Sequence, residues 1–347
     1  MTIMDLEKLV RPNILALEPY SCARNEFSGT ASVWLDANES PFNAPYNRYP
    51  DPLQLKVKEL LSQLKGVPAE SIFLGNGSDE CIDLMYRIFC APGVDNVVAM
   101  SPSYGMYQVC ADVNDVEYRK VPLNNDFSIN YDAMLAAVDE HTKVMWICSP
   151  NNPTGTAAGV DELLAFSKRV PCILVIDEAY IDFSSKGSML QFLAQAPNVV
   201  VMQTLSKAWG SAGVRMGMAF AQPAIISLMN NVKYPYNINI LTQQYALDQL
   251  AKSDEVKAQV AILLEQREVL KQQLVQLDCV NKIYPTDANF VLVEVSDADA
   301  IYNYLLDEGI VVRNRNRVEK CQGCLRITVG TPQENETLLN GLKNYGK

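Results

Sequence analysis

Three apolar stretches of this chain are each followed by residues that could do chemistry. The stretches cover 144–148, 172–176 and 199–202, and after them come Asn152, then Asp177 and Tyr180, then Lys207 with Arg215. Short β-branched runs of this kind predict buried parallel strands. Ligands bind beyond the carboxyl ends of such strands, so we expect these side chains to gather at one sheet edge. A reactive lysine beside an aspartate that can hold a pyridinium nitrogen is the arrangement that pyridoxal 5'-phosphate requires.

The segment around Lys207 favours a bulky cofactor that carries a phosphate. Small residues follow the lysine at 208 and 210–213. A desolvated lysine has a lowered pKa, and its neutral amine can attack an aldehyde. Arg215 could hold a phosphate with its planar guanidinium, helped by the hydroxyls of Thr204 and Ser206. The alternatives are a solvated lysine and a surface ion pair for Arg215.

Asp177 ends an apolar run, where a charge is costly unless it is paired. A protonated pyridine nitrogen would be such a partner, and keeping that proton makes the ring an electron sink. Tyr180 and Asn152 could donate hydrogen bonds to the phenolic oxygen of the same ring. Capping of the strand end would explain Asp177 but not its coincidence with Lys207. Glu178 has no assigned role.

The segment from Gly75 to Glu80 predicts a phosphate site at the start of a helix. Backbone N–H groups at a helix N-terminus favour an anion, so Ser78 and Asp79 would lie beside the phosphate. The two glycines would allow close approach to the backbone. A nicotinamide site would need a third glycine where Glu80 stands. A capped helix after a tight turn is the alternative, because serine and aspartate are ordinary N-cap residues.

Tyr104 and Arg326 complete the candidates that the residues themselves indicate. Tyr104 follows the strand expected at 97–100, where its ring could stack on a cofactor, although core packing would explain it equally well. Arg326 lies inside an apolar run, and burying it requires an anionic partner. A substrate carboxylate or phosphate could be that partner, held by two hydrogen bonds. An internal aspartate or glutamate is the structural alternative.

Length and charge limit the classes of protein. The chain has 347 residues, too many for one compact core, so we expect two domains. A net charge of −11 argues against nucleic acid and anionic membranes as partners. The first residues carry Asp5 and Glu7, unlike a signal peptide, and no run approaches a membrane span. We therefore expect a cytoplasmic protein.

The cysteines and the histidine predict no metal site. Nine cysteines without a framework spacing are typical of reduced, mostly buried thiols. Cys321 and Cys324 form the one C-x-x-C pair, but a zinc knuckle needs a second pair and a thioredoxin-type pair would open a helix. The single histidine, His141, excludes a site with several histidine ligands.

The expected elements describe a doubly wound α/β domain followed by a smaller α+β unit. Strands of a mixed, mostly parallel sheet between helices are expected at 71–74, 97–100, 144–148, 172–176, 199–202 and 216–221. A long amphipathic helix over 253–278 would lead to strands at 289–295, 310–313 and 325–329 and helices at 297–308 and 332–345. We predict a large cofactor-binding domain, 43–250, and a small domain from both chain ends, 1–42 and 251–347.

With these residues assembled, the chain resembles the fold type I pyridoxal-phosphate-dependent aminotransferases over nearly its whole length. Within that class it is most similar to the histidinol-phosphate aminotransferases. Besides the cofactor motifs, the similarity rests on Leu17-Glu18-Pro19-Tyr20 with Ala23-Arg24, on 35–42, on Arg48-Tyr49-Pro50-Asp51 and on 324–330. The charged stretch 314–322 has no close match in the family and could alter substrate access.

The resemblance implies a role for each matching residue. Lys207 would bond the cofactor and move the proton, Asp177 would pair with the pyridine nitrogen, Tyr180 and Asn152 would bond the ring oxygen, Tyr104 would stack, and Ser78, Asp79, Ser206 and Arg215 would hold the phosphate. Tyr49 would reach that phosphate from the other subunit of a homodimer. Arg326 would bind the carboxylate of glutamate and the phosphate of histidinol phosphate, with Tyr20, Asn38, Tyr236 and Arg313 on the substrate side. A cis Asn152–Pro153 bond is also implied.

The activity implied is transamination of L-histidinol phosphate with 2-oxoglutarate, giving imidazole-acetol phosphate and L-glutamate in histidine biosynthesis. An aromatic-amino-acid aminotransferase or a threonine-phosphate decarboxylase of the same fold stays open. A non-catalytic regulator that keeps this fold would carry a DNA-binding module in front. Here the chain enters its fold motif within about twenty residues of Met1 and is acidic, which argues against that class.

Overall fold

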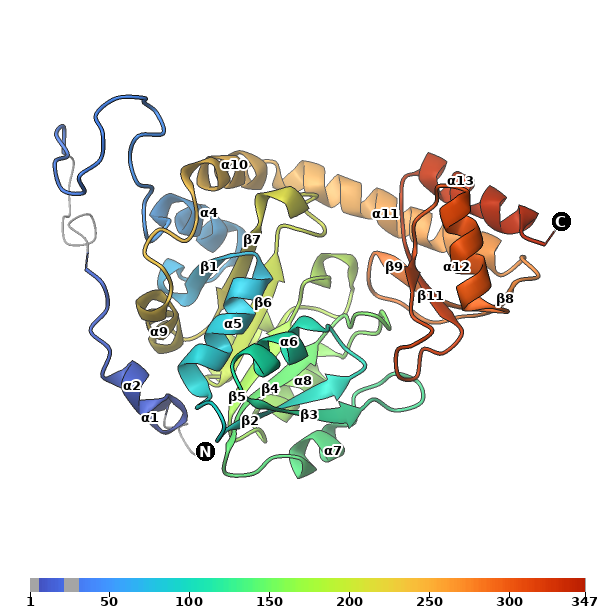
Figure 1. Cartoon of the computed structure of the whole chain (residues 1–347), viewed down its shortest axis with the longest axis horizontal. Coiled ribbons are helices and arrows are strands. Elements are labelled where there is room, and N and C mark those ends of the chain that lie inside the picture. Colours follow the sequence, from blue (N-terminus) through green and yellow to red (C-terminus); the bar gives the residue numbers. More distant parts are fainter. Residues whose placement is uncertain (1–5, 22–30, 347) are drawn as a thin grey trace.

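The computed structural model describes residues 6–21 and 31–346, and its largest feature is a seven-stranded sheet (Figure 1). The strand order is β1-β7-β6-β5-β4-β2-β3. The bounds are β1 Ile72–Asn76, β2 Asn96–Ser101, β3 Glu117–Pro122, β4 Thr142–Cys148, β5 Ile173–Asp177, β6 Val199–Thr204 and β7 Met216–Phe220. Strands β3, β2, β4, β5 and β6 pair in parallel, whereas β7 is antiparallel to both β6 and β1. The predicted mixed, mostly parallel sheet is confirmed.

Helices cover both faces of this sheet because its central strands are apolar on both faces. In β4, Trp146 packs into one core while Met145 and Ile147 pack into the other, as strand alternation requires. Helices α5, α6 and α9 contribute to the first core, and α4, α7, α8 and α10 to the second. Their bounds are α4 Leu55–Lys65, α5 Ser78–Phe89, α6 Met106–Val113, α7 Tyr131–Ala136, α8 Val160–Ser167, α9 Pro223–Val232 and α10 Ile240–Leu250.

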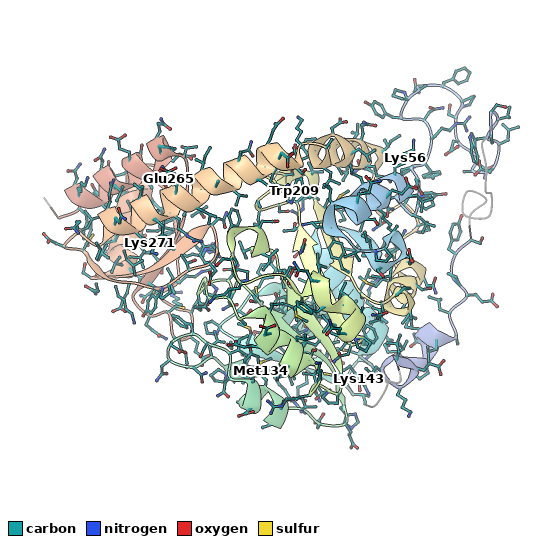
Figure 2. The ribbon with its side chains drawn as sticks, turned by 180° about the vertical axis from the view of Figure 1, so that it is seen from behind. Lys56, Met134, Lys143, Trp209, Glu265 and Lys271 are labelled. Carbon is teal, nitrogen blue, oxygen red and sulfur yellow. The ribbon has the colours of Figure 1, made fainter. Side chains whose placement is uncertain are left out.

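One long helix leads from the large sheet to a smaller one. Helix α11, Ser253–Leu274, has Asp254 and Glu255 in its first turn, where negative charge is favourable. Figure 2 shows this helix, with Glu265 and Lys271 labelled on it, running from the large domain to the small one. The small antiparallel sheet has the order β10-β11-β9-β8. Its elements are β8 Val280–Ile283, β9 Phe290–Val295, β10 Arg313–Asn314 and β11 Cys324–Thr328, with helices α12 Ala298–Asp307 and α13 Pro332–Asn344.

Two strands lie outside the sequence-based expectation. Strands β3 and β8 are edge strands, and most of their residues are exposed or half-buried. They therefore lack the apolar run that identifies a buried strand. The strand expected at 310–313 is also shorter in the structure, where only Arg313–Asn314 pair with β11.

The described N-terminal residues contact the large domain. Helices α1 (Leu6–Leu9) and α2 (Pro12–Leu15) lie beside α5 in Figure 1. Val10, only 4% exposed, packs in the core that α5 helps to form. The N–H of Arg11 donates at 3.0 Å to the carbonyl of Ile88, one of the last carbonyls of α5, which have no partner within the helix. Residues 6–14 therefore pack against the large domain, and the domain boundaries stay a prediction.

Residues 31–50 form an arm that runs outside the body of the large domain (Figure 1). Large apolar side chains on it are exposed, including Val33, Leu35, Phe42 and Tyr46 at 68%, 90%, 74% and 65%. The motif residues Ala23 and Arg24 lie outside the described residues. Within 6–21 and 31–346, no helix is long and apolar enough to cross a membrane.

Candidate active site

Polar segments meet at one edge of the large sheet because the strands before them run in the same direction. Strands β2, β4, β5 and β6 are parallel, and β1 shares their direction because both β1 and β6 are antiparallel to β7. A cavity of about 840 Å³ lies at this edge and reaches residues of the small domain. Most of the predicted site residues line it: Ser78, Asp79, Tyr104, Asn152, Asp177, Tyr180, Thr204, Ser206, Lys207, Arg215, Arg313 and Arg326.

Two glycines allow close approach in the turn between β1 and α5. Gly77 has a φ of +75°, and a Cβ there would lie 2.5 Å from Nη2 of Arg215. A Cβ on Gly217 of β7 would lie 2.4 Å from backbone N of Ser78. The N–H of Gly77 donates to the carbonyl of Arg215 at 2.8 Å. The start of α5 and the Arg215 guanidinium therefore lie together, which is the chemistry of a phosphate site.

Asp79 lies between Arg215 and Tyr104. Its Oδ2 is 3.5 Å from Nη2 of Arg215, and its Oδ1 accepts a hydrogen bond from the Tyr104 hydroxyl at 3.1 Å. Burial and the neighbouring Asp79 carboxylate raise the pKa of Tyr104, so this hydroxyl stays protonated and keeps donating. The hydrogen bond fixes the Tyr104 ring on the cavity wall, where a flat ligand could stack.

The carboxylate of Asp177 is buried at the end of β5 and accepts two hydrogen bonds. Asp177 is 3% exposed. Its Oδ1 accepts from the N–H of Ala179 at 3.0 Å, and its Oδ2 accepts from the hydroxyl of Tyr107 at 2.6 Å. Burial raises the pKa of Asp177, and the two hydrogen bonds and the charge of Lys207 oppose this rise. In the described parts of the chain no basic side chain forms an ion pair with it, so the carboxylate suits a cationic ligand atom.

The loop after β4 holds Asn152 against Arg326. The buried neighbour Asn151 donates from Nδ2 to the carbonyl of Pro102 at 2.9 Å and thereby anchors the loop. The Asn152–Pro153 bond is cis, as the resemblance implies. Nη1 of Arg326 donates to Oδ1 of Asn152. This contact orients the Asn152 amide, because its oxygen is occupied and only Nδ2 is left to donate to a ligand.

Lys207 lies on the loop after β6, where its amine is accessible from the cavity. Its Nζ lies 5.4 Å from the centroid of the Tyr180 ring. Desolvation lowers the pKa of Lys207, the positive charges of Arg326 and Arg215 lower it further, and Asp177 opposes them. A lowered pKa increases the fraction of neutral amine, the form that can attack a carbonyl carbon or accept a proton.

Arginines from the small domain complete the cavity. Arg313 and Arg326 face each other on β10 and β11. Arg315, two residues further along the chain, lines the same cavity. Arg315 and Ser103, which line the cavity, and Tyr107, which donates to Asp177, were not among the predicted site residues. The period-2 alternation from Arg313 could have indicated Arg315, whereas no local pattern marks Ser103 or Tyr107.

Four predicted residues do not line this cavity: Tyr20, Asn38, Tyr49 and Tyr236. The rings of Tyr49 and Tyr236 stack on each other, with centroids 4.4 Å apart and planes at 11°. Tyr20 is 71% exposed. Their roles at an active site stay predictions.

Glu178 and the C-x-x-C pair do not belong to the cavity. Strand alternation turns Glu178 away from Asp177, and its carboxyl accepts from the Ser188 hydroxyl at 2.6 Å and the N–H of Met189 at 2.7 Å. Cys321 and Cys324 are fully buried in the core. Burial raises the pKa of Cys321 to about 11 and that of Cys324 to about 12, which keeps both thiols protonated and unreactive.

Comparison with known proteins gives one family. Residues 22–342 match the family described as Aminotransferase class I and II. The chain is 57% identical over 340 residues to a histidinol-phosphate aminotransferase of Parabacteroides distasonis, covering 98% of this chain and 99% of that one. It is 54% identical over 341 residues to that of Bacteroides thetaiotaomicron, with coverage of 98% and 99%. Among solved structures, the histidinol-phosphate aminotransferase from Sinorhizobium meliloti in complex with pyridoxal-5'-phosphate has a similar fold, with a TM-score of 0.79, 24% identity and coverage of 88% and 89%.

Proposed function

The chain belongs to the class I and II aminotransferases and, within them, to the histidinol-phosphate aminotransferases, and we propose that it holds pyridoxal 5'-phosphate in the cavity at the sheet edge. It transfers the amino group of L-histidinol phosphate to 2-oxoglutarate, which gives imidazole-acetol phosphate and L-glutamate in histidine biosynthesis. The relatives favour neither an aromatic-amino-acid aminotransferase nor a threonine-phosphate decarboxylase.

The cavity residues fit this cofactor at both of its ends. Among the described residues no basic side chain forms an ion pair with the buried Asp177, and a protonated pyridine nitrogen would supply a cationic partner. At Gly77 and Gly217 the chain packs too closely for a Cβ, and this packing places the start of α5 beside Arg215, where backbone N–H groups and a guanidinium could bind a phosphate. The observation that carries the proposal is the buried Asp177 carboxylate in the same cavity as Lys207.

Pyridoxal phosphate, when bound, supplies an aldehyde that bonds to amines and a ring that takes up electrons. The residues of this chain would position it and move protons. Nζ of Lys207 would bond the cofactor and, once released, take the proton from the substrate carbon that bears the amine, a task its lowered pKa suits. Asp177 would keep the ring nitrogen protonated, and Tyr180 and Asn152 would donate to the ring oxygen. Arg326 would bind the anionic group of each substrate.

Purified protein tests this proposal with three amino donors: histidinol phosphate, phenylalanine and threonine phosphate. We expect bound cofactor to be visible in the absorbance spectrum and histidinol phosphate to be the preferred donor. Lys207→Ala should abolish amino transfer. A colourless protein would refute the cofactor, and turnover of phenylalanine without turnover of histidinol phosphate would refute the substrate.

The exposed arm supports a homodimer in which Tyr49 completes the partner's active site. Val33, Leu35 and Phe42 on the arm are exposed, and a second copy could cover them. Tyr49 does not line the cavity of its own chain, as expected if it acts in trans. A mixture of Lys207→Ala and Tyr49→Ala chains tests this, because each mixed dimer would hold one intact site. About a quarter of wild-type activity should return, and no return would refute the shared site.

The cysteines support a cytoplasmic location. The eight described cysteines are all free, and seven of them are buried. Free thiols persist in a reducing compartment, whereas secreted proteins commonly pair theirs. Cell fractionation with an antibody against the chain tests this, and recovery outside the cytoplasmic fraction would refute it.

A further inference from the structure

Three guanidinium groups of the small domain gather on one wall of the cavity. Arg313 on β10 lies directly opposite Arg326 on β11. Side chains two residues apart on an extended strand point to the same side, and Arg315 follows Arg313 by two. All three arginines line the cavity that also holds Lys207. The three charges therefore face the space in which a substrate must lie.

Within residues 6–21 and 31–346, no acidic side chain neutralises these three charges. Nε of Arg315 and Nε of Arg326 are both buried without a hydrogen-bond partner. In the described residues, no carboxylate forms an ion pair with Arg313, Arg315 or Arg326. Burial and, after it, the charges of Arg326 and Arg313 together lower the pKa of Arg315 to about 10. Like charges held together with unused donors are costly unless an anion binds between them.

The loop after β10 holds Arg315 in place without using its side chain. The N–H of Arg315 donates to the carbonyl of Cys324 at 2.9 Å. Asn314 and Asn316 donate from Nδ2 to the Asp299 carboxylate at 2.6 Å and 2.9 Å. The loop is therefore fixed by its backbone and its asparagines, and the Arg315 side chain is left to contact a ligand.

We propose that Arg315 is a specificity residue that recognises the phosphate of the amino donor and adds little to the binding of glutamate. This inference rests on the proposed function, in which both substrates bind at Arg326. A carboxylate has two oxygens and one charge, and a single guanidinium fork satisfies it. A phosphate monoester carries nearly two charges and three acceptor oxygens, so it can engage guanidinium groups from several directions. A third arginine therefore favours the dianion over the monoanion.

The two half-reactions separate this role from a structural one. Single-turnover rates are measured with histidinol phosphate and with glutamate on wild type, Arg315→Gln and Arg315→Lys. The control is Arg317→Gln, which changes an exposed arginine of the same loop that does not line the cavity. We expect Arg315→Gln to lower kcat/KM for histidinol phosphate about 30-fold, the value of one charge-assisted hydrogen bond, and to change that for glutamate less than about threefold. Arg315→Lys should restore only part of the loss, because lysine lacks the planar fork.

Equal losses in the two half-reactions, or no loss in either, would overturn the role of Arg315. Wild type that does not react with histidinol phosphate would instead refute the proposed function.

A binding measurement distinguishes recognition of the substrate phosphate from a general affinity for phosphate. Enzyme whose cofactor has been fixed to Lys207 by borohydride has its cofactor phosphate site filled, so added inorganic phosphate can bind only elsewhere. Histidinol phosphate and inorganic phosphate are titrated into this form of wild type and Arg315→Gln by calorimetry. We expect the variant to bind histidinol phosphate about tenfold or more weakly than wild type does. It should also bind inorganic phosphate more weakly. Unchanged affinity of the variant for histidinol phosphate would overturn the inference, as would a loss confined to inorganic phosphate.

Discussion

The phenolic hydroxyl of Tyr107 donates a hydrogen bond of 2.6 Å to Oδ2 of Asp177. Tyr107 is fully buried, and its ring stacks on Trp146 with centroids 4.7 Å apart. Its backbone carbonyl accepts from the hydroxyl of Tyr86 at 2.6 Å. The burial of Asp177 raises its pKa, and the bond from Tyr107 works against that rise by stabilising the charged form. Tyr107 thus helps Asp177 to remain a carboxylate that can hold a pyridinium proton.

Replacing Tyr107 with phenylalanine should weaken the binding of the cofactor to the protein. The variant keeps the ring stack but removes one hydrogen bond to a buried carboxylate, which is worth roughly 1.5–3 kcal/mol. We expect cofactor affinity to fall about 10- to 100-fold and amino transfer to slow. Titration of the cofactor into apoprotein, followed by absorbance at several pH values, measures the affinity.

Tyr86→Phe is the matched control for this prediction. It removes a buried hydroxyl from the same aromatic stack without touching Asp177. Cofactor affinity should be retained in it, although stability falls. If the two variants lost affinity to the same extent, the effect of Tyr107 would be one of packing alone.

The site residues that could be predicted from the sequence are those that follow the ends of predicted strands. Asp177 directly follows an apolar run and Lys207 lies a few residues after another, and parallel strands bring such ends together. Tyr107 could not be predicted in this way, because it lies on the buried face of helix α6 and looks like any core aromatic residue. Its role depends on which helix packs beside the end of β5, and this is a tertiary fact.

Helices and strands could be predicted where their buried side chains produce a regular pattern of apolar residues in the sequence. Strand β5, buried along its whole length, reads clearly, whereas the edge strands β3 and β8 do not. The position of α1 and α2 beside α5 rests on a contact between residues 11 and 88, far apart in sequence, which no local pattern records.

Gly217→Ala should impair cofactor binding through the backbone alone. The added methyl group would lie 2.4 Å from the backbone N of Ser78 and would push the turn before α5 away from β7. Because that turn supports the proposed phosphate site, we expect cofactor affinity to fall about tenfold or more. Gly213→Ala is the control, since a Cβ there meets nothing within 4 Å. Equal affinities in the two variants would contradict a phosphate site at this turn.

Asn152→Ala should weaken the binding of both substrates. Asn152 accepts a hydrogen bond from Arg326, which orients the guanidinium that would bind either anion. Without this hydrogen bond the guanidinium is no longer held in position. We expect KM to rise about tenfold for glutamate and for histidinol phosphate. This pattern differs from that of Arg315→Gln, which should affect histidinol phosphate selectively. A rise in KM for one substrate only would argue against a shared role of Arg326.

Glu178→Gln should change how stability depends on pH. Burial raises the pKa of Glu178 from 4.5 to about 7, although the Ser188 hydroxyl, Gln203 and the N–H of Met189 all donate to it. A carboxyl whose pKa is higher in the folded state stabilises the fold fully below pH 4.5, and this contribution is lost as the pH rises through about 7. The size of this loss is roughly 3 kcal/mol.

Glutamine cannot ionise, so the variant should keep its stability over this range while wild type loses some. Urea unfolding between about pH 5 and pH 8 measures the effect, and the difference in free energy of unfolding should shift in favour of the variant as the pH rises. Glu265→Gln, a change on the exposed side of α11, is the control and should run parallel to wild type. If Glu178→Gln also ran parallel to wild type, the carboxyl would titrate alike in the folded and unfolded chains, and its hydrogen bonds would be offsetting the cost of its burial.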